Sequence, residues 1–175
     1  MMSFLDALAD IENFVNSGGQ ILRAIAVLTF VMWAMLFERF WFYKGALGNI
    51  VASTLEQWEL RSERNSWNAK KIRIAQISRV SDKINVNLDL IGVMVTLCPL
   101  MGLLGTVTGM IEVFNVLAIT GGGDAKSMAA GVSKATIPTM AGMVAALSGV
   151  FGSSYINKIA QRENQLLEDH LTMDH

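Results

Sequence analysis

Three long apolar stretches dominate the hydrophobic pattern of the chain. The first extends from about Gly19 to Phe37 and contains one charged residue, Arg23. The second covers 90–111 and the third covers 135–157, and both lack Asp, Glu, Lys and Arg. A helix needs about 20 mostly apolar residues to cross a bilayer, whereas a soluble helix carries charges on its outer face. We therefore predict an all-α integral membrane protein with three transmembrane helices.

Basic residues give these helices a predicted orientation. Residues 38–88 carry nine Lys or Arg, the C-terminal end adds Lys158 and Arg162, and the first 20 residues carry none. The positive-inside rule therefore places the N-terminus outside and both basic segments inside. We predict an outer amphipathic segment, three transmembrane helices, an inner helical loop between the first two, a short outer turn between the last two and an inner tail. Their bounds in chain order are 1–17, 18–42, 43–88, 89–119, 120–128, 129–157 and 158–175.

Two polar regions are also expected to be helical. In the first 17 residues, Phe4, Leu8 and Ile11 share one helical stripe, while the acidic residues fall elsewhere. Such a segment lies on a membrane surface or packs on a neighbouring subunit, and the sequence leaves both open. The inner loop has apolar residues at helical spacing from Ile74 to Leu88, with neither Gly nor Pro between residues 51 and 87. The inner loop is therefore expected to extend the helices into the cytoplasm.

The second and third apolar stretches each contain a seam of small residues, spaced alternately four and three apart. Such seams let the backbones of membrane helices approach closely, so we assign their glycines to helix packing. Each of these two apolar stretches also contains one proline, which removes a helical hydrogen bond and is a candidate for a helix kink. The packing glycines are Gly102, Gly105, Gly109, Gly142 and Gly149, and the kink candidates are Pro99 and Pro138.

Four polar residues in this hairpin are candidate functional groups. Counting from a turn centred near residue 123 places Glu112 level with Lys134, and Thr106 level with Thr139. Ionisable groups in membrane spans usually face a bundle interior or a water-filled path, so the first two form a candidate intramembrane charge pair. An ion pair at the outer interface is the alternative for the charges, and bonding to the helix backbone is the alternative for the threonines.

Composition narrows the chemistry further. The net charge of −1 gives no basic surface for nucleic acid, and Cys98 is the only cysteine, inside an apolar stretch. Both histidines, His170 and His175, lie in the polar tail. Because no Ser/His, Cys/His or metal-ligand set is present, we expect no enzymatic activity, no catalytic residue, no cofactor and no metal.

Two motifs carry a resemblance to a known family. Pro99–Met110, with the sequence PLMGLLGTVTGM, and the Phe114 that follows resemble the second-span signature of the ExbB/TolQ/MotA proton-channel family. Gly131–Ala146, with the sequence GVSKATIPTMAGMVAA, resembles its third-span signature. The three spans and the large inner loop extend the likeness over nearly the whole chain. In its short length, the chain resembles a compact ExbB.

The resemblance implies a homopentamer in the bacterial inner membrane, with a periplasmic N-terminus and cytoplasmic loop. It implies that the pentamer surrounds two copies of a single-span ExbD-like protein, and that proton flow energises TonB-dependent outer-membrane transport. It also implies that Thr106 and Thr139 line the pore. The family commonly has glutamate where this chain has Lys134, and Glu112 is a candidate replacement for that acid. A TolQ-like subunit that energises envelope constriction and a passive membrane scaffold are the alternative functions.

Overall fold

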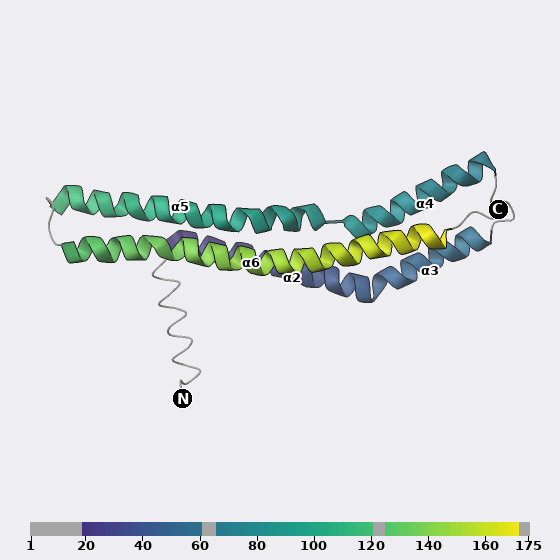
Figure 1. The fold of residues 1–175 in the computed structure, drawn as a ribbon, viewed down its shortest axis with the longest axis horizontal. Helices are drawn as coiled ribbons and strands as arrows, with labels where there is room; N and C mark the ends of the chain where they lie inside the picture. The colour runs from purple at the N-terminus through teal and green to yellow at the C-terminus, as the bar shows by residue number, and fades with distance from the viewer. Residues whose placement is uncertain (1–18, 61–65, 121–124, 172–175) are drawn as a thin grey trace, which may run out of the picture. The chain divides into compact units, whose positions relative to one another are not determined.

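The computed structural model of the chain describes residues 19–60, 66–120 and 125–171. These residues form five helices and contain no strand (Figure 1): α2 (Gly19–Lys44), α3 (Ala46–Glu59), α4 (Trp67–Asn85), α5 (Leu88–Thr120) and α6 (Ala125–His170). Within these described ranges, three helices are long and apolar enough to cross a membrane: α2, α5 and α6. The predicted all-α fold with three transmembrane helices is confirmed. The predicted amphipathic segment 1–17 lies outside the described residues.

The described residues divide into two compact units. The first unit comprises α2 up to Trp33 together with Val93–Val150 from α5 and α6. The second comprises Ala34–Gly92 and the described residues from Phe151 onward, so it contains the ends of the long helices with all of α3 and α4. The first unit therefore holds the small-residue seams, and the second holds the polar helices.

Close contact between α5 and α6 is the main feature of the first unit. A Cβ atom built on Gly142 would lie 2.5 Å from the carbonyl oxygen of Cys98, and one on Gly109 would lie 2.6 Å from the Cβ of Ala135. The α2 helix packs beside this pair, because a Cβ on Gly149 would lie 2.6 Å from the sulfur of Met32. Any side chain added at these glycines would hold the helix backbones apart, so the small residues permit the close packing.

The outside of the first unit is strongly apolar. Phe30, Val144 and Leu147 are each at least 60% exposed within the single chain. Lipid tails are as apolar as these side chains, so a membrane solvates them without cost.

The second unit has an apolar core of its own. Its buried residues come from α3, α4, the C-terminal end of α6 and the residue that follows it: Leu47, Trp58, Ala69, Val80, Ile84, Ala160, Leu167 and Leu171. The α4 helix begins after Ser66, whose side chain accepts a hydrogen bond of 3.2 Å from the backbone N–H of Ala69. This is an N-cap, which satisfies a backbone donor that the first helical turn leaves unpaired.

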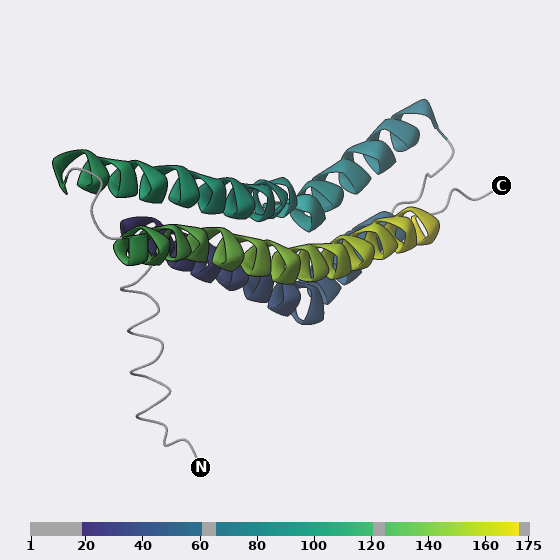
Figure 2. The ribbon, with the colours of Figure 1, turned by 60° about the vertical axis from the view of Figure 1, so that its left-hand side comes forward.

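A short break separates α4 from α5 (Figure 2). Val86 is extended, with ψ at 134°, and Asn87 has a positive φ of 63°. Asparagine adopts this left-handed conformation more readily than most residues, so the break occurs at a residue that tolerates it.

Candidate functional site

Thr139 forms a hydrogen bond between two membrane helices of the first unit. Its hydroxyl on α6 donates to the carbonyl oxygen of Gly102 on α5 over 2.8 Å, and its side chain is half-buried. A Cβ on Gly102 would lie 2.9 Å from both the carbonyl oxygen of Pro138 and the Cα of Thr139. The missing side chain of Gly102 therefore lets the threonine approach the α5 backbone.

Thr106 makes a different contact. Its hydroxyl donates over 2.8 Å to the carbonyl oxygen of Leu103, one turn earlier in its own helix. Thr139 contacts Gly102 and its neighbour Pro138 contacts Gly105, so the level of Thr139 falls between these two glycines, about 3–6 Å short of Thr106 along α5. Counting equal numbers of residues from the centre of the turn predicted that the two threonines are level, whereas in the structure they are offset.

The offset has a physical cause in the shape of Pro138. Its ring packs onto Gly105, where an added Cβ would overlap the ring carbons. The α5–α6 register at this point is thus set by where the proline ring fits Gly105. Both Pro99 and Pro138 lie inside continuous helices. The carbonyls that they leave without a helical donor belong to Val95 and Lys134.

The two threonine hydroxyls share one chemical property. A carbonyl oxygen can only accept, so each hydroxyl proton is committed to the backbone of Gly102 or Leu103. Each hydroxyl oxygen keeps lone pairs that can accept a further hydrogen bond. Thr139 and Thr106 can therefore accept a proton-bearing group, such as water, hydronium or a neutral carboxylic acid, without breaking these bonds.

Glu112 and Lys134 both have exposed side chains. Among the residues that the structure describes, the two do not form an ion pair with each other. Ala135, the neighbour of Lys134, packs on Gly109, so Lys134 is about half a helical turn from the level of Glu112. Their pairing stays a prediction.

The sequence analysis missed two features of the seam. Gly131 also permits close packing, because a Cβ there would lie 2.6 Å from a methyl group of Val113. Trp33 donates its indole N–H to the hydroxyl of Ser148 over 3.3 Å, which links α2 to α6. Gly131 stands at the head of the third-span motif, so its position could have indicated a packing role. Trp33 lies within the first apolar stretch, where hydropathy gives no sign of a partner on a distant helix.

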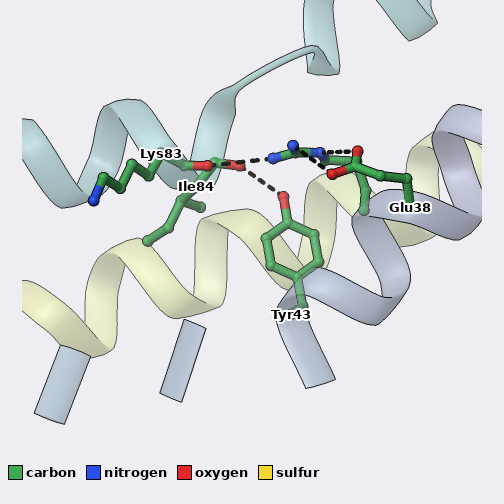
Figure 3. A network of polar contacts seen from close by, with 5 residues as sticks. Glu38, Tyr43, Lys83 and Ile84 are labelled. Atoms are coloured by element: carbon green, nitrogen blue, oxygen red, sulfur yellow. Dashed lines mark hydrogen bonds and ion pairs between the residues drawn. The ribbon is translucent and has the colours of Figure 1, made fainter. Parts of the chain in front are cut away.

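A second polar network joins helices of the second unit (Figure 3). Arg39 is only 6% exposed, forms a two-bond ion pair with Glu38 at 2.8 and 2.9 Å, and donates to the carbonyl oxygen of Lys83 over 3.3 Å. The Tyr43 hydroxyl donates to the carbonyl oxygen of Ile84 over 2.8 Å. These carbonyls belong to the last turn of α4, where helical donors run out. Residues of α2 thus cap α4 beside its break.

Metal chemistry has no visible site in the described ranges. Within residues 19–60, 66–120 and 125–171, no three His, Cys, Asp or Glu side chains gather closely enough to hold a metal ion.

The structure has three apolar helices, and α5 and α6 pack along a glycine seam that Thr139 bridges. These features define a multi-pass helical membrane protein. Residues 43–169 match the MotA/TolQ/ExbB proton channel family, and the chain belongs to that family.

The individual relatives come from two of the three groups that the family name lists, ExbB and TolQ. The chain is 49% identical over 61 residues to an ExbB-like biopolymer transport protein of Synechocystis, which is 33% of this chain and 24% of that protein. It is 37% identical over 90 residues to biopolymer transport protein exbB1 of Vibrio cholerae, 51% of this chain and 40% of that protein. It is 30% identical over 104 residues to the Tol-Pal system protein TolQ of Pseudomonas aeruginosa, 59% of this chain and 43% of that protein.

The chain thus spans less than half the length of each of these relatives. No solved structure matches the chain significantly.

Proposed function

We propose that the chain is the channel-forming and stator subunit of an ExbB-type complex in the bacterial inner membrane. In this proposal five copies surround two copies of a single-span, ExbD-like protein whose intramembrane carboxyl group carries the proton. The complex passes energy to a TonB-like protein that drives outer-membrane transport. Membership of the proton channel family and the likeness to two biopolymer transport proteins support it.

The hydrogen bond from Thr139 to Gly102 is the observation that carries the proposal. Its donor is committed, so the hydroxyl oxygen accepts a hydrogen bond from a neutral carboxylic acid of the partner. A carboxylate has no proton to donate and must find a donor elsewhere. Because the Thr139 hydroxyl can only accept a further hydrogen bond, an apolar surrounding favours the protonated form of the partner's carboxyl group at this level. Thr106, further along α5, offers a second acceptor of the same kind.

The test compares Thr139→Val with Thr139→Ser in cells that also make the single-span partner. Serine keeps the hydroxyl, while valine keeps the shape and removes the acceptor. We expect Thr139→Ser to retain uptake driven by the proton gradient. We expect Thr139→Val to lower uptake about tenfold at equal membrane levels, which corresponds to one hydrogen bond of about 1.4 kcal/mol. Normal uptake by the valine variant would show that the pore role is wrong.

A TolQ-like role in envelope constriction is the second candidate, and the match to TolQ over 104 residues favours it. Deletion of the gene separates the two roles. Loss of growth on iron–siderophore complexes supports the ExbB role, whereas detergent sensitivity supports the TolQ role. If the chain were a passive scaffold, collapse of the proton gradient would leave its function unchanged.

A further inference from the structure

Charge is segregated between the two helices of the cytoplasmic hairpin. The α3 helix contains Glu56 and Glu59 and no basic residue, whereas α4 contains five basic residues and one acidic residue. Arg73 of α4 is used within the chain, because its guanidinium donates to the carbonyl oxygens of Glu168, at 3.0 Å, and Leu171. Lys70 and Lys71 are exposed, and so is Glu56.

These opposite charges lie at the same end of the hairpin. The α3 helix ends at Glu59 and α4 begins at Trp67, so Glu56 and Lys71 are each about one turn from the connection. Trp58 and Ala69 share the same buried core, which keeps the two helices in register there. Among the described residues, neither lysine forms an ion pair with Glu56.

Large apolar side chains are exposed at this same end. Leu60 is 79% exposed, Trp67 is 68% exposed, and the ammonium group of Lys71 lies 3.9 Å from the centre of the Trp67 ring. Tyr43, at the inner end of α2, binds the opposite end of α4. Since α4 has 19 residues, the two ends of that helix are about 28 Å apart. Lipid headgroups beside the Tyr43 end are therefore too distant to cover Leu60 and Trp67.

We propose that a second copy of this chain covers this surface, with α4 of one copy docked on α3 of the next. Lys70 and Lys71 then meet Glu56 of the neighbour, and Trp67 meets its Leu60. A rotation axis parallel to these helices keeps each residue at its own height, so complementary groups must be level, as these are. Because each copy offers one acidic and one basic face, such a head-to-tail contact is heterologous, and it closes into a ring when the rotation between neighbouring copies is a whole fraction of a turn. The inference rests on the ring assembly proposed above.

The two kinds of contact have different tasks in this interface. Exposed ion pairs add little affinity, so the charges mainly fix which faces meet and at which height. The apolar pair at the end of the hairpin removes Trp67 and Leu60 from water and supplies the attraction.

Cysteine cross-linking between two tagged copies tests the contact. The chain has a single cysteine, so Cys98→Ser gives a cysteine-free background. Copies carrying Glu56→Cys with one tag and Lys71→Cys with another are made together, and membranes are oxidised. Only a bond between copies can join both tags, which excludes a disulfide within one hairpin. Asn49→Cys replaces Glu56→Cys as the control, because Asn49 is exposed on α3 two turns away, about 10 Å.

We expect the Glu56→Cys and Lys71→Cys copies to form a product with both tags, at least tenfold more than the Asn49→Cys control gives. Equal yields from the two pairs would overturn the inference, and so would a Lys71→Cys copy that cross-links to Asp169→Cys instead. Native mass measurement of the unmodified protein separates this inference from the proposed function. A monomer there refutes the ring assembly itself. An oligomer that gives no Glu56–Lys71 cross-link refutes only the α3–α4 contact.

Discussion

Replacement of Gly142 by alanine is the most direct test of the glycine seam. The added Cβ would lie 2.5 Å from the carbonyl oxygen of Cys98 and 3.2 Å from the Cα of Gly102. Both neighbours are backbone atoms, so no side chain can rotate away. Restoring an ordinary contact requires α5 and α6 to separate by about 1 Å, which stretches the 2.8 Å bond from Thr139 to Gly102 beyond hydrogen-bond range.

The expected cost follows from these two effects. Overpacking in a close-packed interior costs about 1–3 kcal/mol, and an interhelical hydrogen bond in a membrane adds about 0.6 kcal/mol. Alanine is a better helix former than glycine by about 1 kcal/mol, which opposes the loss. A net destabilisation of about 0.6–2.6 kcal/mol is therefore expected for Gly142→Ala.

The labelling rate of Cys98 reports this change. This sole cysteine is fully buried at the α5–α6 contact, so a thiol reagent reaches it only when the helices open. At about 1.4 kcal/mol per factor of ten, we expect Gly142→Ala in mild detergent to be labelled about 3–80 times faster than the parent. Gly92→Ala is the control, because a Cβ there meets nothing within 4 Å, and its labelling rate should stay at or below the parent value. Equal labelling of both variants would refute the close-packing argument.

Two further predictions concern polar contacts. Tyr43→Phe removes the hydroxyl that donates to the Ile84 carbonyl, and it should lower the free energy of unfolding in a denaturant titration by about 0.5–1.5 kcal/mol. Tyr155→Phe is the control at an exposed site and should change the free energy of unfolding little. A similar loss from both variants would contradict the capping role. Glu112→Gln and Lys134→Met should each impair transport driven by the proton gradient, and the double change should be milder than their sum, whereas strictly additive losses would argue against a charge pair.

The number and type of the membrane helices could be predicted from sequence because hydropathy is a local property. An apolar stretch of bilayer length must form a helix in lipid, since no water is present to satisfy its backbone. The glycine seams could be predicted for the same reason, because residues spaced four and three apart share one face of a helix. Family motifs then pointed to Thr106 and Thr139 as candidate pore residues.

The partners of those residues could not be read from the chain in the same way. The register between α5 and α6 depends on how the Pro138 ring fits Gly105, and counting outward from the turn placed Thr106 and Thr139 level when they are offset by about 3–6 Å. The carbonyl oxygen that accepts the Thr139 hydrogen bond is therefore decided by the tertiary structure.

Arg39 and Tyr43 show the same limit in the second unit. From sequence, Arg39 is one of the basic residues that predict orientation, and Tyr43 begins the predicted inner loop. The fold brings both to the last turn of α4, more than forty residues away along the chain, where they bind backbone carbonyls. Hydropathy and helical spacing act over a few residues, so the sequence by itself determined the helices, their small-residue faces and their family. Contacts between distant helices depend on side-chain shape in three dimensions, so only the tertiary structure decided the register, the acceptor of Thr139 and the capping of α4.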